Sequence, residues 1–290
     1  MLTRTQFQNI LAEKGSLILD GATGTNLQAM GMPRGCCSEL WILEHPDALV
    51  SLQRRYAQAG SDIIYAPTFQ CQPIALERVG LAHQTEALNA KLVALTRQAA
   101  PEALVAGNIT TLTAFTDSWD SDQFDLLVEN YRRQIRGLID GGADLLAAET
   151  LLYPQESEAI FTAAELEGAQ VVTYSYTMQP DGALFSGMDA LPVLQSLADA
   201  GAAAVGFNCV ALDEMVPGLV SKLRRNIRIP VLCKPNAGNP VIGADQLAHY
   251  PLGPQEFASI MKDCATMGAR LLGGCCGTTP DHIQAVRQIL

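Results

Sequence analysis

Two adjacent cysteines near the end of the chain are the sharpest local signal for chemistry. Cys275 and Cys276 stand in the sequence GGCCG, and a third cysteine, Cys209, follows the apolar run AVGFN. Glycines on both sides of the pair allow backbone and side chains to approach one ion closely. Three thiolates that leave a fourth coordination position open are typical of a catalytic zinc site rather than a closed structural one. These residue types indicate a shared metal site.

The other five of the eight cysteines have simpler explanations. Cysteine is among the most buried residue types, so Cys71, Cys233 and Cys264 are expected in the core. Cys36 and Cys37 form a second adjacent pair in GMPRGCCSELW, before an expected helix start, but they have no third partner. We expect them not to bind metal. None of the four histidines has a metal-ligand spacing, so thiolates must hold any metal.

Distant segments of the chain must come together to join these thiols. Apolar runs rich in Val, Ile and Leu recur at residues 16–20, 62–66, 104–107, 144–148, 171–175, 204–208, 230–234 and 270–273. Segments with helical spacing alternate with them, at 49–59, 85–99, 123–140, 155–167, 191–200, 213–225, 255–267 and 281–290. Continuous apolar runs are typical of parallel strands covered by helices. Eight βα units favour a single-domain α/β fold, a (β/α)₈ TIM barrel of residues 1–290, over a doubly wound sheet.

Polar residues follow most of these predicted strands, on the face where barrel enzymes carry their active sites. The residues are Asp20, Asn108, Glu149 with Thr150, Asn208 with Cys209, Lys234 to Asn236, and Gly274 to Cys276. The sixth and eighth strands have one strand between them, so their ends lie about 10 Å apart. Side chains that lean inward from these two strands can therefore share a metal.

Composition and charge exclude several classes of protein. The chain has 290 residues, of which 48% are hydrophobic and 17% charged, as in a packed globular protein. With 19 basic and 30 acidic residues the net charge is −11, which offers no electrostatic footprint for nucleic acid or an anionic membrane. No apolar run resembles a secretory signal or approaches the roughly 18 to 20 residues of a membrane span. We expect a cytoplasmic protein with reduced cysteines and with no nucleic-acid or membrane partner.

The sequence resembles the homocysteine S-methyltransferase family from about residue 16 to residue 290. The matching motifs are LDGATGTNLQ, APTFQCQP, GGADLLAAET, VGFNC, KPNAGNP and GGCCGTTPDHI, which begin at residues 19, 66, 141, 205, 234 and 273. The resemblance implies a (β/α)₈ barrel that holds one Zn²⁺ ion per chain through Cys209, Cys275 and Cys276. It also implies a methyltransferase in which zinc keeps the homocysteine thiol deprotonated, so that its sulfur accepts a methyl group and methionine forms.

The same resemblance implies how the amino-acid end of homocysteine is bound. Asp20 and Glu149 are expected to receive its ammonium, because two carboxylates at strand ends make a charge-assisted anchor for one cation. The turn that contains Gly21 and Gly24 is expected to offer backbone N–H groups to the substrate carboxylate.

Two asparagines are further candidates beside the thiols. By resemblance to the methionine synthase branch, the side-chain oxygen of Asn236 is the candidate fourth zinc ligand in the resting state. Both asparagines are counted with the substrate-binding residues, and Asn208 is expected to orient the thiolate site as a hydrogen-bonding group.

The methyl donor is indicated by finer features of the resemblance. The motif DGATGT, residues 33–64 and KPNAGNP look most like the homocysteine module of cobalamin-dependent methionine synthase. The expected donor is then a methylated corrinoid, either methylcobalamin or a corrinoid protein. A chain of 290 residues leaves no room for a cobalamin domain, so a separate chain or another part of a longer protein would carry the corrinoid. Thr150, where the betaine branch usually has Tyr, argues against betaine. The family often has Gly-Pro after the third strand, whereas this chain has Asn108 to Thr110.

Three alternatives remain open at this point. The chain can be an S-methylmethionine-dependent homocysteine methyltransferase that works alone, or a corrinoid-pathway methyltransferase that acts on another thiol. It can also be a non-catalytic barrel stabilised by structural zinc. Removal of the metal would unfold that barrel, and added homocysteine would leave the metal ligands unchanged.

Overall fold

The computed structural model describes residues 1–112, 123–243 and 248–290, and in these ranges eight parallel strands form one sheet. The strand order is β1-β10-β7-β6-β5-β4-β3-β2. The strands are β1 (Leu17–Ile18), β2 (Ile63–Tyr65), β3 (Leu104–Ile109), β4 (Leu145–Leu151), β5 (Val172–Tyr176), β6 (Ala204–Ala211), β7 (Val231–Asn236) and β10 (Ala269–Leu272). A parallel bridge between Leu19 and Ile63 joins the two edges of the sheet. The predicted single-domain (β/α)₈ barrel is confirmed.

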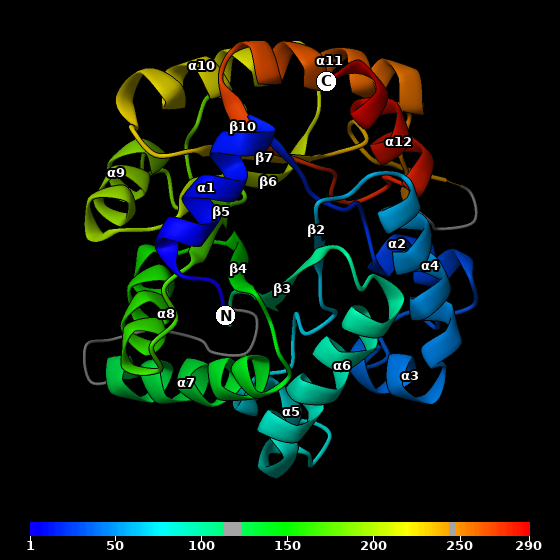
Figure 1. Ribbon diagram of the computed structural model, residues 1–290, viewed down its shortest axis with the longest axis vertical. Coiled ribbons are helices and arrows are strands. Elements are labelled where there is room, and N and C mark those ends of the chain that lie inside the picture. Colours follow the sequence, from blue (N-terminus) through cyan, green and yellow to red (C-terminus); the bar gives the residue numbers. More distant parts are fainter. Residues whose placement is uncertain (113–122, 244–247) are drawn as a thin grey trace.

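Helices surround the barrel, as Figure 1 shows. They are α4 (Pro46–Gln58), α6 (Thr85–Ala99), α7 (Phe124–Asp140), α8 (Pro154–Leu166), α9 (Ala190–Ala200), α10 (Val216–Asn226), α11 (Pro254–Thr266) and α12 (Pro280–Ile289). The predicted helices fall on these elements, with ends that differ by a few residues at most. Gly201 and Gly268 follow α9 and α11 with a φ of +111°, a left-handed conformation that suits glycine at a helix end.

An additional helix, α1 (Arg4–Lys14), precedes the first strand and lies across the strands in the centre of Figure 1. Its Phe7 is buried in the cluster that fills the barrel interior, together with Leu17, Leu145 and Ala204. These residues lie at the amino-terminal ends of their strands, so α1 covers that end of the barrel. Phe7 is the one buried residue of this mostly polar helix, and the sequence pattern therefore gave no sign of it.

Short elements occupy the loops at the opposite, carboxyl-terminal end of the strands. They are α2 (Gly24–Ala29), α3 (Ser38–Glu44), α5 (Pro73–Glu77), the 3₁₀ turn η1 (Ala82–Gln84) and a hairpin of β8 (Val241–Ile242) and β9 (Ala248–His249). The expected helix start after Cys37 is confirmed by α3. The other short elements were not predicted, because each is too brief to show a periodicity. Within the described ranges, no helix is long and apolar enough to cross a lipid bilayer.

Candidate active site

Three thiols meet at the carboxyl-terminal mouth of the barrel. Cys209 lies in β6, and Cys275 and Cys276 lie in the loop between β10 and α12. The Sγ atom of Cys209 is 2.7 Å from that of Cys275 and 4.0 Å from that of Cys276. The sulfurs of Cys275 and Cys276 are 4.0 Å apart. In the described part of the chain, these three cysteines are the group of side chains arranged to share one metal ion.

The donor chemistry of this cluster suits zinc. Zn–S bonds of about 2.3 Å in a tetrahedral site place two sulfurs about 3.8 Å apart, and two of the three separations are close to that value. Hydrogen bonds within the cluster lower the pKa of Cys276 far below its ordinary value and raise the pKa of Cys209. Soft thiolate ligands favour zinc, whereas metals such as magnesium and calcium prefer oxygen ligands.

Irregular backbone in two strands aims side chains at the mouth. The register of β4 shifts between Ala148 and Leu151, and that of β6 shifts between Asn208 and Ala211. Among described residues other than glycine, positive φ occurs at Thr150 (59°) and Cys209 (55°), inside these two shifts. Such a backbone is strained and persists only where its surroundings hold it.

Asn208 is part of what holds this strained backbone. Its Oδ1 accepts hydrogen bonds from the N–H of Thr150 and from Oγ of Ser175, both at 2.8 Å. Its Nδ2 donates to Oγ1 of Thr150 at 2.7 Å and lies 3.9 Å from Sγ of Cys275. Asn208 is completely buried and is not among the residues that line the cavity. The structure thus places Asn208 in β6, next to the thiol of Cys275 and hydrogen-bonded to Thr150 of β4.

Asn236, at the end of β7, connects the two segments that carry the thiols. Its Nδ2 donates to the carbonyl oxygen of Cys209 at 3.2 Å, and its Oδ1 accepts from the N–H of Cys276 at 3.1 Å. Next to it, the N–H of Cys275 donates to the carbonyl oxygen of Pro235 at 2.7 Å. Strand β7 therefore sets the spacing between Cys209 and the adjacent pair. The expected role of Asn236 as a fourth zinc ligand stays a prediction.

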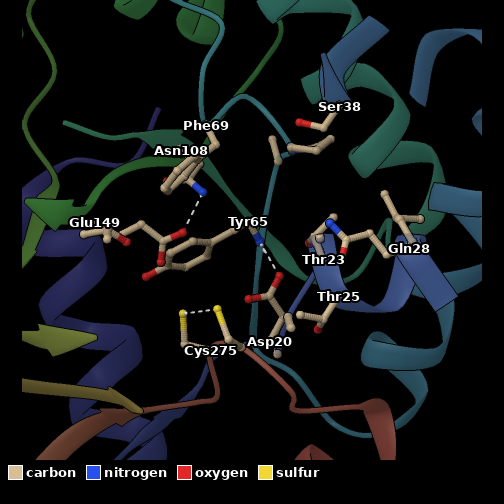
Figure 2. A pocket seen from close by; sticks show the side chains of 18 of the residues that line it. Asp20, Thr23, Thr25, Gln28, Ser38, Tyr65, Phe69, Asn108, Glu149 and Cys275 are labelled. Carbon is tan, nitrogen blue, oxygen red and sulfur yellow. Dashed lines mark hydrogen bonds between the residues drawn. The ribbon is translucent and has the colours of Figure 1, made fainter. Parts of the chain in front are cut away.

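A buried charged group, Asp20, Glu149 and Lys234, lies beside the thiols. Nζ of Lys234 is 3.4 Å from Oε2 of Glu149, 3.9 Å from Oδ1 of Asp20 and 4.7 Å from the ring centroid of Tyr65. Oδ2 of Asp20 accepts from the N–H of Tyr65 at 2.9 Å, and Oε1 of Glu149 accepts from Nδ2 of Asn108 at 2.8 Å. Figure 2 shows Asp20, Tyr65, Asn108 and Glu149 around the cavity above Cys275.

Burial governs the protonation of this charged group. Loss of hydration raises the pKa of Asp20 to about 7, although Lys234 opposes the shift. Burial likewise raises the pKa of Glu149. For Lys234, burial alone would lower the pKa, but the charges of Glu149 and Asp20 outweigh it and raise the pKa well above its usual value. Lys234 therefore remains an ammonium ion.

The three thiols and the buried charged group line one cavity of about 360 Å³, a size that suits a small ligand. Its other wall comes from the turn after β1 and from α2 and α3, with Thr23, Gln28 and Ser38 on this side (Figure 2). Gly21 and Gly24 both line the cavity. A Cβ atom at Gly21 would lie 2.6 Å from the hydroxyl of Tyr56, whereas at Gly24 it would meet open space. Only the first of these two positions requires glycine for packing.

The site also contains residues to which the sequence gave no role. Lys234 and Asn108 were noted only as residues at strand ends, and Asn108 also as part of a departure from a family pattern. The available signal was a lysine directly after the apolar run PVLC, since a buried lysine needs a carboxylate partner. Nothing local identified Tyr65, whose ring and backbone contact Lys234 and Asp20.

The remaining cysteines lie outside the cluster. Cys71, Cys233 and Cys264 are completely buried, which confirms their predicted place in the core. Cys36 is exposed, and its Sγ contacts the carbonyl oxygen of Pro33 at 3.0 Å. Cys37 lies before α3 with its Sγ 3.6 Å from Oε2 of Glu39.

Together, the (β/α)₈ fold and a cluster of three thiols placed to share one metal ion at the carboxyl ends of its strands are typical of barrel enzymes with a thiolate metal centre. Residues 17–290 match the model of the homocysteine S-methyltransferase family, and the chain belongs to this family.

Individual relatives differ in how much of their length the chain covers. It is 30% identical to a methionine synthase of Mycobacterium tuberculosis, over 97% of this chain but 25% of that protein. It is also 30% identical to a homocysteine S-methyltransferase of Escherichia coli, over 96% of both chains. The crystal structure of the metallated homocysteine methyltransferase MmuM from Escherichia coli superposes with a TM-score of 0.83 at 28% identity, over 97% of this chain and 99% of that one. The chain thus spans about a quarter of the methionine synthase and nearly all of the shorter enzyme.

Proposed function

We propose that this chain is a zinc-dependent methyltransferase that transfers a methyl group to the sulfur of homocysteine and so forms methionine. The observation that carries the proposal is the convergence of Cys209, Cys275 and Cys276 beside a buried charged group in one cavity. Relatives named methionine synthase and homocysteine S-methyltransferase support the substrate and the product. Residues 1–290 then act as one homocysteine-binding module, and the free thiols fit a cytoplasmic location.

In this proposal Cys209, Cys275 and Cys276 hold one zinc ion, with Asn236 as the resting fourth ligand. Bound zinc would lower the pKa of a coordinated thiol, so that the substrate sulfur is a thiolate at neutral pH. Asn236 keeps the backbones of Cys209 and Cys276 in place, and Asn208 holds the backbone of Thr150 beside them.

The cavity walls hold the rest of homocysteine. Asp20 and Glu149 attract the substrate ammonium, and their burial strengthens this attraction because the surrounding dielectric constant is low. The backbone of the turn with Gly21 and Gly24 faces the same cavity. Contacts at the amino-acid end fix the orientation of the substrate relative to the three cysteines.

We further propose that the methyl donor is a methylated corrinoid, presented as methylcobalamin or by a corrinoid protein. Five exposed apolar side chains, here called the apolar rim, lie in the segments that follow β5, β6 and β7 and support a large apolar-faced partner there: Phe185, Met188, Met215, Val241 and Ile242. These side chains are between 50% and 63% exposed. The partner can be a separate chain or another part of a longer protein.

The match to an Escherichia coli homocysteine S-methyltransferase over almost its entire length favours a second candidate. In that case the chain works with a small donor such as S-methylmethionine and needs no corrinoid. A donor panel of methylcobalamin, S-methylmethionine and betaine, supplied with homocysteine and purified chain, distinguishes the two candidates.

The zinc site is tested by metal analysis and X-ray absorption. We expect one zinc per chain, lost in Cys209→Ala, Cys275→Ala and Cys276→Ala but retained in the matched control Cys264→Ala, whose thiol is buried in α11. The wild-type spectrum should show three sulfurs and one lighter atom, and four sulfurs after homocysteine is added. A spectrum that does not change with homocysteine would contradict the proposal and support a structural metal.

A further inference from the structure

We infer that Lys234 determines substrate specificity: its ammonium binds the carboxylate of an amino-acid thiol, while the free oxygen of Asp20 binds the ammonium of the same molecule. The inference rests on the proposed function, because it states how that cavity selects homocysteine among thiols. It differs from the sequence-based expectation, in which the glycine turn alone held the carboxylate.

Lys234 has hydrogen-bonding capacity that its neighbours do not fill. An ammonium carries three N–H donors, and its bonds to carboxylates are usually 2.7–2.9 Å long. Here the distance to Oε2 of Glu149 is 3.4 Å and that to Oδ1 of Asp20 is 3.9 Å. The side chain is 5% exposed and lines the cavity. A buried cation with such long contacts favours an additional anionic acceptor.

Asp20 and Asn108 each have a buried acceptor oxygen that lacks a hydrogen-bond donor among the described residues. Oδ1 of Asp20 is buried and, within the described part of the chain, has no hydrogen-bond partner. The same is true of Oδ1 of Asn108, whose Nδ2 is occupied by Glu149. Both residues line the cavity. Buried acceptors without partners are costly, so these oxygens favour a ligand that donates hydrogen bonds.

A ligand that supplies both a donor and an anionic acceptor is an α-amino acid. Its ammonium and carboxylate are attached to one carbon atom, and Oδ1 of Asp20 lies 3.9 Å from Nζ of Lys234. Asp20 and Glu149 contribute two negative charges and Lys234 one positive charge, so a zwitterion enters without adding net charge. A thiol with only a carboxylate adds a negative charge, and a thiol with only an ammonium leaves Lys234 without its acceptor.

The test measures binding of three thiols of equal reach to the zinc-loaded chain by calorimetry. They are L-homocysteine, 3-aminopropane-1-thiol, which lacks the carboxylate, and 4-mercaptobutanoate, which lacks the ammonium. Wild type should prefer homocysteine to both. In Lys234→Met the preference for homocysteine over the aminothiol should fall about 10- to 100-fold, the usual effect of losing one charged hydrogen bond. Lys234→Arg should restore part of it.

Controls separate recognition from folding. Lys91→Met, on the exposed face of α6, should leave every affinity unchanged. The double variant Lys234→Met with Glu149→Gln keeps the net charge of the cavity and should show the same loss of preference. If it retains the wild-type preference, the turn holds the carboxylate and the assignment of Lys234 is overturned. Equal or tighter binding of 4-mercaptobutanoate by wild type would overturn the role of Asp20.

Failure of the proposed function gives a different pattern. If homocysteine neither binds wild type nor enters the metal coordination sphere, the homocysteine activity is wrong and the assignment of Lys234 falls with it. If homocysteine binds and ligates the metal but Lys234→Met weakens all three thiols equally, only the assignment of Lys234 is wrong.

Discussion

Asp20 is a carboxylate that the fold keeps almost completely out of water, at 1% exposure. Its pKa of about 7 in the folded protein is far above the ordinary value of 3.8. The folded state therefore binds this proton more tightly than the unfolded state does. The resulting stabilisation is fully present below about pH 4 and is lost as the pH rises through about 7. The ionised form that attracts a substrate ammonium is thus obtained at the expense of stability.

Asp20→Asn tests this cost, because asparagine imitates the protonated carboxyl. At pH 8 the variant should be more stable than wild type by at most about 4 kcal/mol, and the difference should disappear below about pH 4. Urea unfolding at a series of pH values measures the difference. Glu149, Lys234 and Cys275 face Asp20 and are present in both proteins, so they largely cancel in the comparison. Parallel pH profiles for the two proteins would show that Asp20 is ionised in the fold throughout.

Two irregular strands, β4 and β6, direct site residues toward the mouth of the barrel. Regular strands would point alternate side chains to opposite faces. The shifts after Ala148 and Asn208 interrupt this alternation, and they bring Thr150 and Cys209 to the mouth in a left-handed backbone. Asn208 links the two shifts across β5.

Asn208→Ala should therefore weaken metal binding, because the backbone that carries Cys209 loses a hydrogen-bonding support. We expect a loss of about 1–3 kcal/mol in stability and about a 10- to 100-fold loss in zinc affinity. Competition with a zinc chelator measures the affinity. Asn130→Ala is the matched control, since this buried asparagine of α7 accepts a hydrogen bond from the N–H of Ile74 in α5. It should lower stability and leave zinc affinity unchanged. Equal zinc affinity in Asn208→Ala and wild type would contradict the positioning role.

The whole molecule presents its chemistry at one end. Helix α1 covers the amino-terminal end of the barrel, whereas the cavity and the apolar rim lie at the carboxyl-terminal end. A donor must therefore approach from the carboxyl-terminal end, where the loops after β5, β6 and β7 carry the apolar rim. A large corrinoid partner would contact these loops, and a small sulfonium would pass them.

Phe185→Ser combined with Ile242→Ser tests which donor the rim serves. With a corrinoid protein as donor, the methyl-transfer rate should fall about 10-fold or more, as expected when interface anchors are removed. Homocysteine binding and zinc content should not change. Leu126→Ser, at an exposed position on α7, is the control and should have no effect. A normal rate in the double variant would favour a small-molecule donor.

The sequence by itself determined the repeating βα units, the parallel barrel and the identity of the thiols, because apolar periodicity and residue chemistry are local properties. It also placed Asp20, Glu149 and Asn236 at strand ends. Only the tertiary structure decided that Lys234 from β7 lies between Asp20 after β1 and Glu149 from β4, because closure of the barrel brings these strands together. The tertiary structure also decided two other features: the cavity wall formed by α2 and α3, and the left-handed backbone at Cys209. They depend on packing between distant segments, which a local pattern does not record.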